Sequence, residues 1–207
     1  MFYSTVTHNP AQARLVHGFS LFTGVIDVDT EYWKSLAAAL RSFTELRTLY
    51  FWYTYSNGVP VAYILEGCKC QLDTFNWLPF YEPSLIPFLE SQSLIKHLSL
   101  RWEDEDQEGA NLSASALPNL RTLQGNQGVI NAILPNRPQI THLHWVPELE
   151  DEITPDMSRI GPALSSIRVL QYGAYFAAPE FRYVVGYLAN IQVLHWNNGA
   201  IEVSFSI

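Results

Sequence analysis

Hydrophobic and polar residues follow one short frame that recurs along the chain. The frame consists of an apolar residue, two variable residues, Leu or Phe, one variable residue and, in most copies, a second apolar residue. Leu46–Phe51 and Ile95–Leu100 are two of its copies. Because successive side chains of a strand point to opposite faces, the frame predicts one half-buried strand for each copy. The central residues of the eight copies are Phe19, Leu49, Phe75, Leu98, Leu123, Leu143, Leu170 and Leu194.

The spacing of these copies predicts a repeat architecture. Leu194 stands 175 positions after Phe19, and seven intervals separate them, which gives a mean spacing of 25. Between copies the apolar residues change to a helical period, most clearly over residues 30–43, which Asp29 or Thr30 can cap. A strand and a helical return every ~20–29 residues are typical of leucine-rich repeats. Shorter helical stretches are predicted at 62–65, 85–89, 129–134 and 181–188.

The sequence therefore predicts an α/β fold. We expect an irregular leucine-rich-repeat solenoid, with a curved parallel sheet inside the arc and helices and loops outside it. It is expected to be irregular because none of the residues five positions after a central residue is Asn, which often bonds the turns of such repeats. The predicted organisation is one leucine-rich-repeat domain over residues 1–207, with about eight repeats and an N-terminal lead-in at 1–15.

The last residues predict a different element. Asn198-Gly199 is a strong signal for a tight turn, and apolar and polar residues then alternate through residues 201–207. Val203 follows Leu194 by only nine residues, which is too few for a ninth repeat. We therefore expect residues 197–207 to form a C-terminal hairpin cap, with the final strand antiparallel to the last repeat strand. The alternative is a frayed strand that once led into further repeats.

The chain resembles the leucine-rich-repeat region of fungal F-box-type proteins over essentially its whole length. The resemblance rests on frames such as Leu46-Arg47-Thr48-Leu49 and Ile167-Arg168-Val169-Leu170, and on the opening from Asn9-Pro10 to Ala13-Arg14-Leu15-Val16-His17-Gly18-Phe19-Ser20-Leu21. It implies a non-enzymatic protein-protein interaction module whose repeats hold the substrate of a ubiquitin ligase. In that family an F-box binds the adaptor of a cullin ligase. No F-box is found in residues 1–207, so we expect adaptor binding only if one is supplied. The alternative is a repeat scaffold unconnected to ubiquitin.

Composition narrows the choice of partners. The chain has 12 Lys and Arg against 20 Asp and Glu, and its formal net charge of −8 disfavours binding to nucleic acid. It has no apolar run of about eighteen residues and no signal-like start, so we expect no membrane partner and a cytoplasmic location, with the nucleus as the alternative. Cys68 and Cys70 are too close in the chain for an unstrained disulfide and are expected to be reduced thiols.

The candidate binding residues belong to the concave face of the predicted sheet. Residues one before, one after and three after each central residue are expected to point away from the core. Large apolar side chains on three adjacent strands are typical of a protein interface, and the histidines add hydrogen-bonding or pH-sensitive contacts. The predicted partner-binding residues are Phe22, Tyr50, Trp52, Leu78, His97, Arg101, His144 and His195. The alternative is that the N-terminal segment or a preceding domain covers the apolar part.

Motifs of catalytic, phosphate-binding and zinc sites are missing from the sequence. It contains no G-x-S-x-G, G-x-x-x-x-G-K-[ST], G-x-G-x-x-G or H-E-x-x-H. Residues Asp104 to Gly109 resemble the opening of a calcium loop, but Ser115 stands where such a loop needs a bidentate Glu. The histidines of the concave face are too far apart to share one ion. We expect no enzymatic activity, no cofactor and no metal, with a hydrolase that uses an unrecognised acidic pair as the rival.

Overall fold

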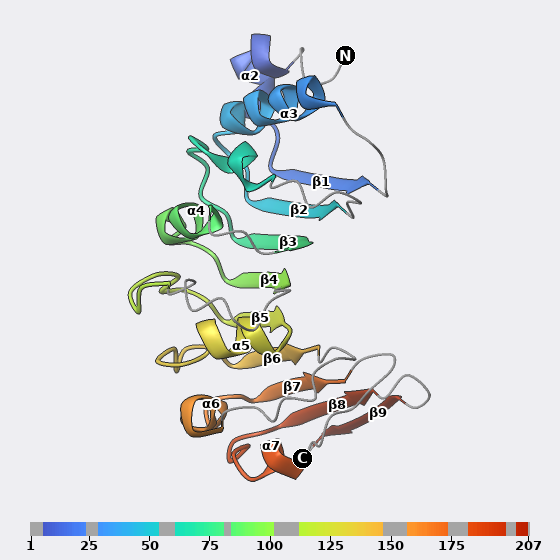
Figure 1. Cartoon of the computed structure of the whole chain (residues 1–207), viewed down its shortest axis with the longest axis vertical. Helices are drawn as coiled ribbons and strands as arrows, with labels where there is room; N and C mark the ends of the chain where they lie inside the picture. Colours follow the sequence, from blue (N-terminus) through green and yellow to red (C-terminus); the bar gives the residue numbers. More distant parts are fainter. Residues whose placement is uncertain are drawn as a thin grey trace.

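A computed structural model of the chain shows one long sheet with helices and turns along one side (Figure 1). No helix in the part of the chain that it describes is long and apolar enough to cross a membrane. The described residues are 6–23, 29–53, 61–80, 84–101, 112–146, 157–173, 182–197 and 202–206.

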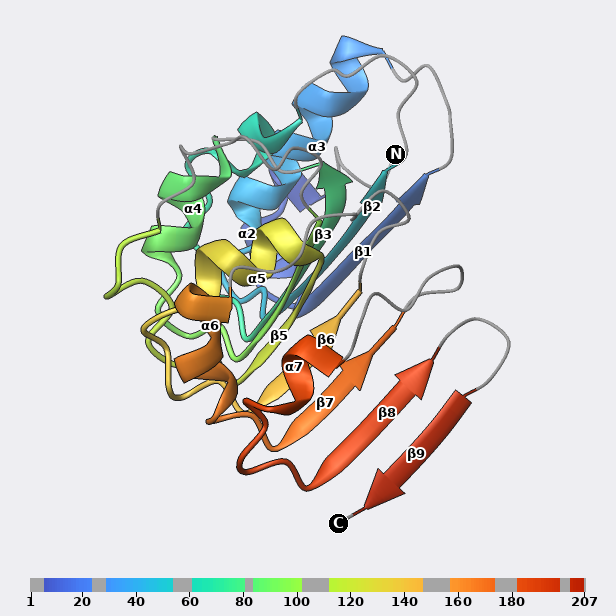
Figure 2. The same cartoon turned by 60° about the horizontal axis from the view of Figure 1, so that its bottom comes forward.

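Nine strands form the sheet within these ranges, and their order in the sheet is their order in the sequence. Strands β1 to β8 are parallel, and β9 is antiparallel to β8 (Figure 2). The strands are β1 (Gly18–Thr23), β2 (Thr48–Tyr53), β3 (Thr74–Phe80), β4 (His97–Arg101), β5 (Thr122–Gly125), β6 (His142–Trp145), β7 (Val169–Tyr172), β8 (Val193–Asn197) and β9 (Glu202–Ser206).

The register of the parallel strands follows the sequence frame. Phe19 stands opposite Leu49, Leu49 opposite Phe75, and the central residues remain aligned across every following pair of strands as far as Leu194. Phe19 and Leu194 are partly buried, and the six central residues between them are buried. A slip of one residue would turn every central side chain to the other face, so this alignment confirms the strand predictions.

One helix precedes β1, and the other helices lie between successive parallel strands; together with the turns they cover one face of the sheet (Figures 1 and 2). Together with the parallel strands they make the fold α/β, as the sequence predicts. These elements are α2 (Pro10–Ala13), α3 (Thr30–Ser42), the 3-10 helix η1 (Ala62–Leu65), α4 (Leu85–Ser91), α5 (Gln127–Ile133), α6 (Met157–Leu164) and α7 (Arg182–Val185).

Helix α3 forms where the sequence predicts the clearest helix. The carboxylate of Asp29 caps it by accepting a hydrogen bond from the backbone N–H of Tyr32 at 2.7 Å. Its buried face packs on the sheet through Trp33, whose ring centroid lies 6.1 Å from that of Phe51 and 5.0 Å from that of Tyr53. The helix-covered face of β2 is therefore the core face.

Other helices differ from their predicted bounds. Helix α6 is not among the helices predicted from the sequence, and it contains Gly161 and Pro162, two residue types with low helix propensity. Helix α5 begins at Gln127, earlier than the predicted residue 129, because the side chain of Asn126 caps the backbone N–H of Val129. Helix α7 ends at Val185, short of the predicted residue 188.

The end of the chain contains the strand that its alternating pattern predicts. In β9, Val203 stands opposite Trp196 of β8 and Phe205 stands opposite Leu194, in antiparallel register. The pairing gives β8 a backbone partner on the side away from β7. A strand that lacks such a partner presents a row of free N–H and C=O groups that can pair with another chain.

Removal of residues 200–207 is expected to increase self-association, because it uncovers the edge of β8. Light scattering after size-exclusion chromatography, at one protein concentration for both forms, measures the change in mass. A shortened chain with the same mass distribution and the same thermal midpoint as residues 1–207 would show that β9 does not protect the edge.

Candidate functional site

The two faces of the sheet differ in exposure. Along β2, Leu49, Phe51 and Tyr53 are buried beneath the helices, whereas Tyr50 and Trp52 are exposed. The exposed side chains occupy the positions one and three after the central residue, as the alternation of a strand requires. We call the face formed by the positions one before, one after and three after each central residue the open face.

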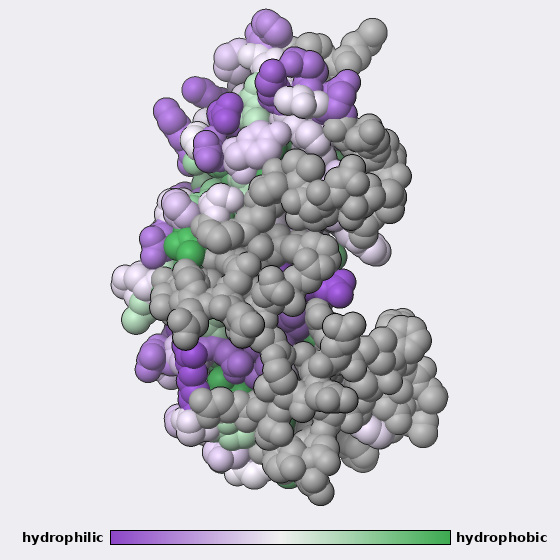
Figure 3. Space-filling view, in the orientation of Figure 1, coloured by the Kyte–Doolittle hydropathy of each residue, from purple (hydrophilic) through white to green (hydrophobic). Residues whose placement is uncertain are grey.

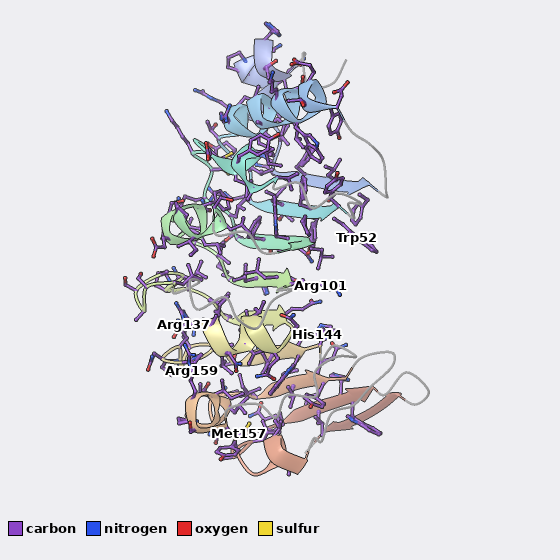
Figure 4. The ribbon with its side chains drawn as sticks, in the orientation of Figure 1. Trp52, Arg101, Arg137, His144, Met157 and Arg159 are labelled. Carbon is purple, nitrogen blue, oxygen red and sulfur yellow. The ribbon has the colours of Figure 1, made fainter. Side chains whose placement is uncertain are left out.

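An aromatic patch occupies the start of the open face. We define the aromatic patch as Phe22 of β1 with Tyr50 and Trp52 of β2, which are 65%, 37% and 49% exposed. Phe22 stands opposite Trp52 in the strand register, and their ring centroids lie 6.0 Å apart in an edge-to-face arrangement at 71°. Two neighbouring strands therefore hold the three aromatic side chains close together on the surface. Figure 4 labels Trp52 of this group.

Leu78 occupies the matching position on β3, but it contributes less surface. Its side chain is half-buried, and the paired register of β2 with β3 ends one residue earlier, at Phe51 and Trp77. Beyond Trp77 the pairing of β3 with β4 shifts, so that Phe80 stands opposite Arg101. The aromatic patch is thus centred on β1 and β2, with Leu78 at its margin.

The remaining candidate residues lie farther along the open face. His97 and Arg101 are exposed on β4, whereas His144 of β6 and His195 of β8 are half-buried. Figure 4 shows Trp52, Arg101 and His144 along the strand side of the molecule. His144 lies in a cross-strand row with Gln124 on one side and Gln171 on the other. Burial lowers the pKa of His144 and so favours the neutral form of its imidazole.

The open face carries very little charge. Of its 24 positions, one before, one after and three after the eight central residues, only Arg101 is charged. The chain's overall charged fraction of 15% would place about four charges there. Depletion of charged residues is one feature of the centres of protein interfaces. Aromatic residues occupy three of these 24 positions, a share close to the 14% of the whole chain, and all three lie at the start of the open face.

The described ranges hold no cluster of metal-binding residues. No three His, Cys, Asp or Glu residues among them are placed to hold one metal ion. The calcium-like segment of residues 104–109 lies outside the described part of the chain. Both cysteines are free thiols, and burial, with a smaller contribution from Cys70, raises the pKa of Cys68 to about 12. The Cys68 thiol is therefore protonated at neutral pH and is a poor nucleophile.

Asn126 departs from the position rule for the open face. It stands three residues after Leu123, yet it is buried because its side chain turns to cap helix α5. The sequence signal for this cap is an Asn immediately before a helical stretch. Where a strand runs directly into a helix, the capping position decides the orientation of the side chain, and the alternation of the strand no longer applies.

Comparisons with known proteins do not assign this chain to a family. No protein-family model matches this chain, and the search of curated proteins gives no match either.

Proposed function

We propose that this chain is a non-enzymatic protein-binding module, built as an irregular leucine-rich-repeat solenoid, and that a partner protein binds its open face. The solenoid proposal is supported by the recurrence of one frame in eight consecutive parallel strands that keep a common register. Stacking of units in chain order, each against only its neighbours, is the construction principle of repeat proteins.

The observation that carries the binding proposal is the aromatic patch. Phe22 and Trp52 keep about half or more of their surface exposed although they stand beside a core that buries most other large apolar side chains. Aromatic side chains are enriched among residues that dominate binding energy, and surrounding uncharged groups help to exclude water from them. The open face around the aromatic patch has this uncharged character.

The resemblance to F-box-type proteins indicates what kind of partner the open face binds. We propose that the partner is a substrate for ubiquitin transfer, and that the adaptor of a cullin ligase binds only when an F-box segment is supplied. Residues 1–207 alone are then expected to recover a substrate protein, without the adaptor, in a capture experiment. Recovery of the adaptor by this chain would contradict the proposed division of roles.

Replacement of Trp52 by alanine is expected to weaken partner binding by about 2 kcal/mol, or about 30-fold in Kd, with little loss of stability. The partner is first identified by crosslinking and capture with residues 1–207 as bait, and Kd is then measured by biolayer interferometry. Val185→Ala is the matched control, because Val185 is an exposed apolar residue on α7. Unchanged affinity in Trp52→Ala would show that the partner does not use the aromatic patch.

A further inference from the structure

A pocket of about 260 Å³ lies on the helix side of the molecule. Two arginines, Arg137 and Arg159, line it together with Asn136 and the apolar side chains of Leu112, Ala132 and Pro135. Figure 4 shows both arginines on the helix side, opposite Trp52 and Arg101. This side carries mainly hydrophilic residues on its described surface (Figure 3). The pocket is therefore separate from the open face.

The loop after helix α5 turns Arg137 back into the protein. Asn136 has a φ of 62°, a left-handed conformation that Asn tolerates better than most residues, and the backbone N–H of Arg137 then donates to the carbonyl of Leu134 at 3.3 Å. The guanidinium of Arg137 reaches two backbone carbonyls from different segments. Its Nη1 donates to Ile133 at 2.6 Å and its Nη2 donates to Ser113 at 2.9 Å.

These two bonds leave the Arg137 guanidinium incompletely satisfied. A guanidinium has five N–H donors, so three have no partner within the described part of the chain, and the buried Nε is one of them. Arg137 is only 2% exposed, and no described ion pair includes it. Burial accordingly lowers the pKa of Arg137. A buried charge without a counter-charge is costly, because carbonyl dipoles replace only part of its lost hydration.

Arg159 brings a second positive charge to the same pocket. It belongs to helix α6, its side chain is exposed, and no ion pair of the described residues involves it. No acidic residue is among the described residues that line the pocket, so the two guanidinium groups that share it repel each other. The same two groups attract an anionic oxygen group and can bond it with charge-assisted hydrogen bonds.

We infer that this pocket is an anion site that takes a small molecule or a chain terminus bearing a carboxylate or phosphate group. Arg159 and Arg137 supply the positive charge, the amide of Asn136 supplies a further donor, and the apolar walls accommodate a short carbon skeleton. The anion neutralises the buried guanidinium, so its binding stabilises the folded chain by mass action. The site is independent of the proposed protein-binding role of the open face.

The test titrates ¹⁵N-labelled residues 1–207 with inorganic phosphate and, separately, with acetate, against sodium chloride at equal ionic strength. The readouts are the Nε–H signal of Arg137 and the thermal midpoint. We expect a saturable shift of the signal and a rise in midpoint with at least one anion, and none with chloride. Tighter binding of phosphate indicates a phosphorylated ligand, and tighter binding of acetate indicates a carboxylate ligand.

Arg159→Gln is the decisive variant, because Arg159 is exposed and its replacement should not disturb folding. It is expected to weaken anion binding at least about tenfold. Arg168→Gln is the matched control, since Arg168 is an exposed arginine outside the pocket. The inference is overturned if neither anion acts differently from chloride, or if Arg159→Gln binds as tightly as the original chain. Failure of the open-face proposal leaves these results unchanged, because the two tests use different residues and ligands.

Discussion

Replacement of Trp77 by alanine is expected to reduce the free energy of unfolding by about 3–5 kcal/mol, the largest effect that we expect from a single core substitution. Trp77 is fully buried on β3 and stacks on Phe51 of β2, with ring centroids 4.5 Å apart and an interplanar angle of 14°. Phe75 packs against the same indole at 5.9 Å. Removal of the ring leaves a cavity beside Phe51 and Phe75, and such a cavity closes only in part.

Two controls separate this effect from a general sensitivity to loss of tryptophan. Trp52→Ala makes the same change on the opposite face of the adjacent strand, where the side chain is exposed, and is expected to cost less than about 1 kcal/mol. Trp77→Phe keeps a ring against Phe51 and removes an indole N–H that has no hydrogen-bond partner among the described residues, so its cost is expected to be well below that of alanine. Urea denaturation with a constant m value measures all three. Equal losses of unfolding free energy in Trp77→Ala and Trp52→Ala would contradict the assignment of Trp77 to the buried face of the sheet and of Trp52 to the open face.

Strand positions and register were predictable because they depend on a local pattern. Leu49 and Leu143 are separated by several strands, yet each is the middle of the same short frame and each stands in the same row of the sheet. The exposure of Trp52 follows from the same alternation. Helix α3 was also predictable, because Asp29 provides a local capping signal and the apolar stripe is long.

Features that depend on contacts between distant segments could not be read from the sequence. Gly161 and Pro162 read as breakers, but they lie within α6, where Tyr187 passes so close that a Cβ on Gly161 would meet its ring at 2.4 Å. Glycine there permits close packing of α6 on a neighbouring segment. Arg is usually a surface residue, and only the folded chain shows that Arg137 is buried and that it lines the same pocket as a second arginine.

Gln92 is another residue whose role appears only in the folded chain. It follows helix α4 and is 1% exposed. Its Oε1 accepts a hydrogen bond from the backbone N–H of Leu72 at 2.9 Å, and its Nε2 donates to the carbonyl of Cys70 at 3.1 Å. One amide side chain thus satisfies a donor and an acceptor in the segment that leads into β3, and it joins two successive strand-helix units.

Gln92→Ala is expected to destabilise the chain by about 2–4 kcal/mol, because it leaves one buried N–H and one buried C=O without a partner and also creates a small cavity. Urea denaturation gives the loss, and amide hydrogen exchange at Leu72 shows where it acts, since that N–H loses its acceptor. Gln71→Ala is the neighbouring control: Gln71 also bonds the backbone between units, but at an exposed position where water replaces the lost bonds. A loss in Gln92→Ala no greater than that in Gln71→Ala would contradict the proposed role.

Gln92→Glu tests the same contacts through pH. The carboxylate still accepts from Leu72 but cannot donate to Cys70, and it places a charge in a buried position, so the pKa of this glutamate in the folded chain is raised above its unfolded value. The folded variant then binds its proton more tightly than the unfolded one, and its stability relative to the original chain rises as pH falls from about 8 to about 5. Protonation of the introduced carboxylate gives it an O–H group that can donate to the carbonyl of Cys70. A stability difference that stays constant over this range would show that residue 92 is open to water and that the buried link between the units does not depend on it.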